Sequence, residues 1–158
     1  MSKKSGKIAE RIASFQGGEI SAYYLGYFDC FNQQEFYEAH DVLEELWLPD
    51  RRGPDGDFYK GLIQLAGAFV HLQKERLRPS AALFKLARTN LSKYPVAHKH
   101  LDLAVVLNLI EMWLAWLEGR DFDHNLTSKD STQAAAEREA GCDQNLALRA
   151  TTAMSRST

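Results

Sequence analysis

The stretch FYKGLIQLAGAFVHL, residues 58–72, places apolar side chains on almost every side of a helix that turns about 100° per residue. Its apolar members are Phe58, Leu62, Ile63, Leu65, Ala66, Phe69, Val70 and Leu72. A helix that is apolar nearly all round is typical of an element with neighbours on several sides, because a surface helix keeps a wide polar face. We therefore predict a central helix over residues 58–76.

Outward from this helix, the other segments also have helical periodicity, and proline, glycine or asparagine marks the breaks between them. Pro49 is expected to end the helix before it, because the residue that precedes a proline disfavours helical geometry. Asp57 is a candidate N-cap for the central helix. The predicted helices cover residues 19–31, 34–47, 58–76, 79–93 and 96–118. No segment alternates strictly between apolar and polar residues, so we predict no sheet but an all-α fold, a compact and mostly antiparallel bundle.

The two ends of the chain differ from this middle part in composition. Residues 1–18 end in two glycines and are predicted to form a flexible N-terminal arm. Residues 127–158 have no aromatic and few aliphatic side chains, so they bury too little apolar surface to offset the entropy lost on ordering. We therefore predict a helical bundle domain over residues 19–126 and a disordered tail over residues 127–158.

The bulk composition argues against several classes of protein. The net charge of −2 over 158 residues does not favour nucleic acid or an anionic membrane surface as a partner. Cys30 and Cys142 lie far apart and outside any metal-binding spacing, so both are predicted to be free thiols in a reducing compartment. The basic N-terminus lacks the apolar core of a secretory signal, and no apolar run reaches the roughly 18 residues of a membrane span. These features predict a cytoplasmic protein without a membrane segment.

The most informative polar residues lie in EFYEAHDVLEELW, residues 35–47. His40 is at the edge of the apolar arc of the predicted helix, and Glu44 is on the same face because residues four apart are neighbours. An imidazole at the border of a core needs a hydrogen-bond partner, since burial of an unpaired polar group is costly. We expect Glu44 to be that partner. Asp41 projects to the other side and is expected on a solvated face.

Gln64 and His71 belong to a polar strip on the central helix. They are seven residues apart and therefore stack on one face, with Gly67 between them. Two placements of the strip remain open. It faces water, or it faces the helix over residues 34–47 and completes a network with the histidine–glutamate pair described above. In the second placement Gly67 would permit close approach of the two backbones.

The last predicted helix, residues 96–118, is apolar on most sides. Trp113 and Trp116 are expected to fill either the core or a subunit contact. An apolar terminal helix of this kind favours a homo-oligomer, with the two-fold symmetry that is usual for dimers.

Two motifs, FNQQEFYEAHDVLEELW (residues 31–47) and FYKGLIQLAGAFVHL (residues 58–72), resemble those of a bacterial and archaeal family of small all-helical proteins, domain of unknown function 309. The positions that carry the resemblance are Phe31, Asn32, Glu38, Ala39, His40, Glu44, Trp47, Gly61, Gln64 and His71. The resemblance extends over roughly residues 22–119 and departs at Ser80-Ala81, where the family usually has Gly-Ala. It implies an all-helical bundle and brings no established activity.

Three interpretations of the polar residues remain open. They form a buried network that fixes helix register, or they form the pocket of a non-enzymatic module that binds a small ligand or a protein partner. The candidate binding residues are Glu38, His40, Glu44, Trp47, Gln64 and His71. The third interpretation is a metal-dependent enzyme, hydrolase-like, in which His40, Glu44 and His71 hold Zn or Fe. The sequence contains no HExxH, no nucleophile elbow and no phosphate-binding glycine loop, so we assign no catalytic residue.

Overall fold

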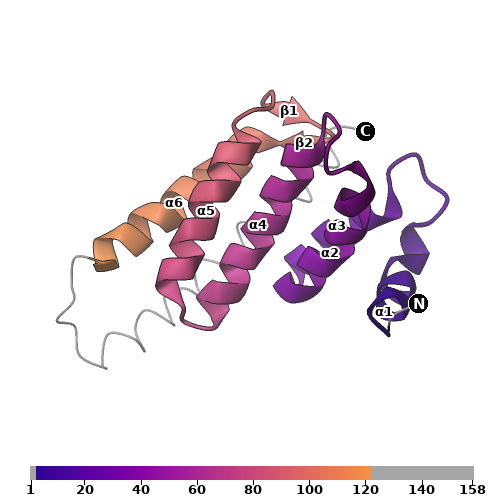
Figure 1. The fold of residues 1–158 in the computed structure, drawn as a ribbon, viewed down its shortest axis with the longest axis horizontal. Coiled ribbons are helices and arrows are strands. Elements are labelled where there is room, and N and C mark those ends of the chain that lie inside the picture. Colours follow the sequence, from indigo (N-terminus) through magenta and orange to yellow (C-terminus); the bar gives the residue numbers. More distant parts are fainter. Residues whose placement is uncertain (1–2, 122–158) are drawn as a thin grey trace. The chain divides into compact units, whose positions relative to one another are not determined.

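The structure, a computed structural model, describes residues 3–121, which are helical apart from short connections and one very short hairpin (Figure 1). The chain divides into two compact units, residues 1–94 and 95–158. The described elements of the first unit are α1 (Lys3–Ile12), the 3-10 helix η1 (Ala13–Phe15), α2 (Ala22–Asn32), α3 (Phe36–Asp50), α4 (Gly56–Gln73) and α5 (Leu77–Leu91). Those of the second unit are β1 (Ala97–His98), β2 (Leu101–Asp102) and α6 (Leu103–Asp121). The predicted all-α class is confirmed, and the tail predicted over residues 127–158 lies outside the described residues.

Helix α4 is the centre of the first unit, as its apolar surface predicts. It contacts both α3 and α5, and α2 contacts α3 in turn. Figure 1 shows α4 between α5 on one side and the α2–α3 pair on the other. The side chains of Phe58, Leu62 and Ala66 are fully buried. Burial on several sides therefore stabilises α4 more than its own helix propensity does.

Phe69 lies at the point where four helices of the first unit meet. Its ring stacks on Phe36 of α3 with centroids 4.8 Å apart. It also makes edge-on contacts with Phe31 of α2 at 5.5 Å and with Phe84 of α5 at 5.2 Å. Both kinds of ring geometry are favoured by the quadrupole of the aromatic ring. This aromatic cluster holds α2, α3 and α5 around α4.

Tyr94, not Asp57, satisfies a free amide at the start of α4. The Phe58 N–H donates to the Tyr94 hydroxyl at 3.0 Å, and that hydroxyl donates to the Pro54 carbonyl at 2.8 Å. The predicted N-cap is therefore wrong. Helix α4 begins one residue earlier than Asp57, and the residue at the N-cap position, Asp55, makes no side-chain capping bond. The sequence around the start of α4 does not indicate this hydrogen bond, because Tyr94 lies 36 residues after Phe58 in the chain.

Asp57 instead pairs with Lys93, whose ammonium lies 2.8 Å from the carboxylate on the surface. This hydrogen bond, supported by the charge of Lys93 and more weakly by that of Lys60, lowers the pKa of Asp57 from its ordinary value of 3.8. Since the folded-state pKa is depressed, the pair stabilises the fold above the unfolded-state pKa, and the stabilisation is lost as the pH falls through the folded-state pKa.

We predict that an NMR titration of the Asp57 carboxyl carbon has a midpoint below 3.8 and that Lys93→Gln moves it upward. Lys60→Gln is the matched control, and it should move the midpoint less because Lys60 acts on Asp57 through charge alone. A titration that Lys93→Gln leaves unchanged would contradict the pairing.

Two local features differ from the sequence-based predictions. Residues 3–12, placed in a flexible arm, form helix α1. Helix α3 continues through Pro49 to Asp50, because the fixed φ of proline is itself helical and costs only one hydrogen bond at the last turn. The domain predicted over residues 19–126 stays a prediction.

A small hairpin, where no sheet was predicted, precedes α6 in the second unit. Strands β1 and β2 are antiparallel, with Ala97 opposite Asp102 and His98 opposite Leu101. The two residues between the strands, Lys99 and His100, both have positive φ, which is the geometry of a tight hairpin turn. Asp102 Oδ1 then accepts the Ala104 and Val105 amides at 3.0 and 3.4 Å and caps α6.

Candidate functional site

A cleft of about 340 Å³ lies between α3, α4 and α5 of the first unit. It is lined by Tyr37, His40, Ile63, Gln64, Gly67, Val70, His71 and Leu83. Its volume is at the lower end of the range for small-molecule sites, which are mostly apolar with a few placed polar groups. The lining has this character, because aliphatic side chains from α4 and α5 stand beside an amide and two imidazoles.

The polar strip of α4 faces this cleft. Gln64 and His71 line it together with His40, so the two helices present their polar residues to the same space. Gly67 lies between them, and a Cβ at this position would come within 3.2 Å of Leu83 Cδ1. The glycine therefore keeps the cleft open toward α5, rather than bringing α3 and α4 together as proposed from the sequence.

Asn90 of α5 orients Gln64. Its amide Nδ2 donates to Gln64 Oε1 at 2.7 Å, and its own Oδ1 accepts from Lys93 at 3.3 Å. Asn90 is a buried polar residue that the sequence analysis did not select, although an asparagine on the apolar face of an amphipathic helix is a usable signal. Since the Gln64 oxygen is engaged, the Gln64 amide NH₂ is left as a hydrogen-bond donor.

One ring nitrogen of His71 makes no hydrogen bond with the described residues. Its Nδ1 is buried and has no hydrogen-bond partner among the described residues. A buried polar atom without a partner is costly, so this nitrogen needs a group that is not part of the described chain. His71 is also one of the residues that line the cleft.

Tyr37 forms an exposed aromatic wall beside the cleft. Its side chain is 61% exposed, which is unusual for a large aromatic residue. The ring lies nearly parallel to the His40 imidazole, with centroids 6.5 Å apart. The Lys74 ammonium lies 5.9 Å from its centroid, within the range of a cation–π contact.

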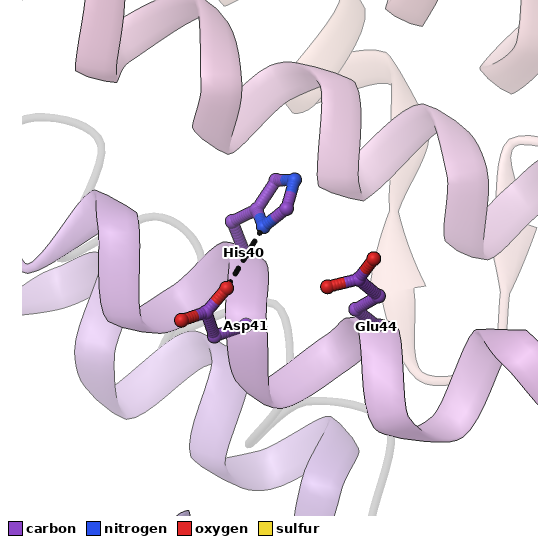
Figure 2. A group of neighbouring side chains, drawn as sticks. All are labelled: His40, Asp41 and Glu44. Carbon is purple, nitrogen blue, oxygen red and sulfur yellow. Dashed lines mark hydrogen bonds and ion pairs between the residues drawn. The ribbon is translucent and has the colours of Figure 1, made fainter. Parts of the chain in front are cut away.

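His40 also belongs to a second feature, the His40 cluster, which consists of His40, Asp41 and Glu44 on α3 (Figure 2). Each residue offers one ligand atom, and these atoms all lie within 4.8 Å of one another. Figure 2 shows the imidazole joined to Asp41, with the Glu44 carboxylate further along the helix. The His40 Nδ1 to Asp41 Oδ1 distance is 3.3 Å. The acceptor for His40 is thus Asp41, not Glu44 as predicted.

Lys4 of α1 explains why the predicted roles of the two acids are wrong. Its ammonium lies 2.9 Å from Asp41 Oδ1 and 3.0 Å from Glu44 Oε2. Asp41 was assigned to a solvated face, but α1 covers this part of α3 and leaves the carboxylate only 19% exposed. Hydrogen bonds to Asp41 and Glu44 raise the pKa of Lys4, against the opposing effect of partial burial.

Arg11 holds the other end of α1. Its guanidinium lies 3.3 Å from Asp29 Oδ2 on α2 and 3.0 Å from Glu35 Oε1 before α3. The neighbouring thiol of Cys30 is free and fully buried, and this burial raises its pKa. The prediction of a free thiol is therefore correct for Cys30, whereas Cys142 lies outside the described residues.

The remaining predicted site residues lie away from the cleft. Glu38 is exposed and lines a separate pocket of about 470 Å³ between α1 and α3. Trp47 is half-buried, and its Nε1 has no hydrogen-bond partner among the described residues. Glu44 lies in the His40 cluster but is not part of the cleft lining. The six predicted residues thus divide among four places, since Trp47 belongs to neither pocket nor to the cluster, and His40 is the member shared by the cleft and the cluster.

Residues 24–83 match the model of the family DUF309, described as a domain of unknown function. This segment is a DUF309 domain. The match confirms the resemblance found in the sequence over a shorter range than the predicted residues 22–119, and it assigns no role to any residue. The DUF309 segment runs from α2 into α5 and therefore contains the His40 cluster and the whole lining of the cleft. Lys4 and Arg11 precede it.

No curated protein and no solved structure matches the chain. Within residues 3–121, no helix combines the length and the apolar character that crossing a bilayer requires. A cytoplasmic location and a homo-oligomer stay predictions from the sequence, as does the expectation that nucleic acid is not a partner.

Proposed function

We propose that the DUF309 segment is a non-enzymatic binding module whose ligand occupies the cleft between α3, α4 and α5. The observation that carries this proposal is the buried Nδ1 of His71, which has no hydrogen-bond partner among the described residues and belongs to a residue of the cleft lining. The same cleft is lined by His40 and Gln64, so a ligand in it would meet three polar side chains.

The lining also indicates the chemistry of the ligand. Aliphatic side chains of Ile63, Val70 and Leu83 favour a flat apolar body, and the Tyr37 and His40 rings offer faces for stacking. The amide NH₂ of Gln64 fits an acceptor, while neutral His71 fits a donor or an acceptor according to its tautomer. A small heteroaromatic molecule that has both a ring N–H and a ring nitrogen acceptor meets these requirements.

Benzimidazole is a suitable probe, because it has one ring N–H and one acceptor nitrogen. We expect it to bind with millimolar affinity and to shift the NMR signals of the Gln64 side-chain amide and the His71 ring. His71→Phe keeps a planar ring and removes the nitrogen, so it should weaken binding roughly two- to tenfold, the value of one hydrogen bond. His100→Phe in the exposed hairpin turn is the control and should leave binding unchanged. Shifts that map outside the cleft, or equal affinity of both variants, would contradict the proposal.

The metal-dependent hydrolase, which was the alternative from the sequence, has less support. His71 is not a member of the group whose ligand atoms are mutually close, and Asp41 stands in its place. Metal binding by the His40 cluster would not determine which ligand occupies the cleft.

A further inference from the structure

We infer that the pocket between α1 and α3 is a binding site for a free α-amino acid with an aromatic side chain, in which Lys7 binds the carboxylate and Glu38 binds the ammonium group. The pocket has a volume of about 470 Å³, within the range of about 300–1,000 Å³ that is usual for small-molecule sites. It shares only Tyr37 with the lining of the cleft, so the inference does not depend on the function proposed above.

The floor of this pocket is apolar. Ile8 of α1 and Val42 of α3 line it, and both side chains are buried. Tyr37 also lines it, and this ring is exposed beside the two buried aliphatic side chains. A ligand ring placed on Ile8 and Val42 would cover part of the Tyr37 ring, and aromatic rings favour edge-on or offset contacts of this kind.

Three of the five charged side chains in the lining are already paired. Lys4 and Asp41 pair with each other at 2.9 Å. Arg11 pairs with Asp29 and Glu35, and neither of these acids lines the pocket. These charges are therefore satisfied within the chain before a ligand enters.

The other two charged side chains, Lys7 and Glu38, make no hydrogen bond or ion pair within residues 3–121. They have opposite charge and come from the two helices that bound the pocket, α1 and α3. Both are exposed, so they lie nearer to solvent than the apolar floor does. The pocket thus presents one positive and one negative group on its two walls, with space between them.

This arrangement indicates a zwitterion. A purely anionic ligand would be attracted by Lys7 and repelled by Glu38, and a purely cationic ligand would meet the opposite combination. An α-amino acid has a carboxylate and an ammonium group on one carbon atom, with its side chain beside them. Its two charged groups complement Lys7 and Glu38, and an aromatic side chain complements the floor.

The site combines two parts of the chain. Tyr37, Glu38 and Val42 belong to the DUF309 segment, residues 24–83, whereas Lys7 and Ile8 belong to α1, which precedes it. A bound amino acid would contact both parts.

The test is an NMR titration of the full chain with three compounds that carry the same phenyl ring. L-phenylalanine has both charged groups, 3-phenylpropionate lacks the ammonium group, and phenethylamine lacks the carboxylate. We expect L-phenylalanine to bind with millimolar affinity and to shift the methyl signals of Ile8 and Val42. Each analogue should bind about two- to fivefold more weakly, because a solvent-exposed ion pair contributes little.

Two substitutions assign the charges. Lys7→Gln should abolish the advantage of L-phenylalanine over phenethylamine, and Glu38→Gln should abolish its advantage over 3-phenylpropionate. Each variant should keep the other advantage. The matched controls are Lys60→Gln and Glu10→Gln, which remove exposed charges outside the lining and should leave all three affinities unchanged.

Four outcomes would overturn the inference. They are no binding of L-phenylalanine, equal affinity of the three compounds for the wild-type chain, variants that behave as their controls do, and shifts at Ile63 and Leu83 of the cleft without shifts at Ile8 and Val42. The last outcome would leave the function proposed for the cleft intact, so the two proposals fail separately.

Discussion

Phe69→Ala is expected to lower the free energy of unfolding of the first unit by about 3–5 kcal/mol, the usual cost of removing a buried phenylalanine ring. Phe69 is 1% exposed and contacts the rings of Phe31, Phe36 and Phe84, which belong to three different helices. The substitution removes the apolar contact and leaves a cavity at the meeting point of these helices. Because small domains are stable by only about 5–15 kcal/mol, such a loss is a large share of the total.

Urea denaturation followed by far-UV circular dichroism measures this effect, with Tyr37→Ala as the control. Tyr37 is also an aromatic residue of the first unit, but its side chain is 61% exposed, so its removal should cost less than about 1 kcal/mol. A Phe69→Ala midpoint close to that of Tyr37→Ala would show that the aromatic cluster does not hold the helices together.

The central position of α4 could be predicted from the sequence because it depends on one local property. The all-round apolar surface of residues 58–72 requires neighbours on several sides, and the structure provides α3 and α5. The positions of helices α2 to α5 follow from periodicity and from proline and glycine breaks, which are local as well. Their number and class were therefore accessible without coordinates. The helix predicted over residues 96–118 is wrong at its start, because α6 begins at Leu103 and residues 97–102 form the hairpin.

Helix α1 was not predicted because its stability depends on distant residues. Its sequence is polar and contains Gly6, and only Ile8 and Ile12 give it an apolar face. That face docks where Gly26 leaves room, since a Cβ there would lie 2.6 Å from Ile12 Cγ2. A short helix of this composition is marginal in isolation, so tertiary contacts decide whether it forms.

The candidate site could be predicted only in part, because some of its contacts depend on distant residues. Helical spacing places Gln64 and His71 on one face, and they line one cleft with His40. The partners of the polar and charged residues come from other helices, because Asn90 donates to Gln64 and Lys4 pairs with Asp41 and Glu44. Spacing along one helix identifies which side chains lie together, whereas the hydrogen bonds that each makes depend on the neighbouring helices.

The hairpin before α6 could not be predicted from the residue types in its turn. A tight turn of this kind requires positive φ at both central residues and usually contains Asn-Gly, Asp-Gly or Gly-Gly. Here Lys99 and His100 adopt it with φ of 47° and 62°. The Leu103 N–H donates to the Val96 carbonyl at 2.7 Å beside the turn and helps to fix the geometry. Neither turn residue has the sequence preference that would have predicted it.

The second large effect on stability is expected from a substitution at Gly61 in α4. At Gly61, an added Cβ would lie 2.8 Å from Leu91 Cγ and 3.3 Å from Asn90 Cβ, so this glycine permits the close approach of α4 and α5. Leu91 is fully buried and cannot move aside without disturbing its neighbours. Gly61→Ala should therefore destabilise the fold by about 1–2 kcal/mol, because an overpacking cost of about 1–3 kcal/mol exceeds the helix-propensity gain of up to about 1 kcal/mol.

Gly67→Ala is the matched control, with the same chemical change in the same helix and the same gain in propensity. Its Cβ would meet only Leu83 Cδ1, at 3.2 Å, and Leu83 is a half-buried side chain at the edge of the cleft that is able to rotate. We expect a change in stability within about 0.5 kcal/mol of zero.

The two variants should also differ at the cleft. Displacement of Asn90 by Gly61→Ala would shift the NMR signal of the Gln64 amide through the 2.7 Å hydrogen bond, even at a site that the new methyl group does not touch. Equal stability of the two variants would mean that α4 and α5 adjust to the extra carbon, and that the close approach of these helices does not fix the orientation of Gln64.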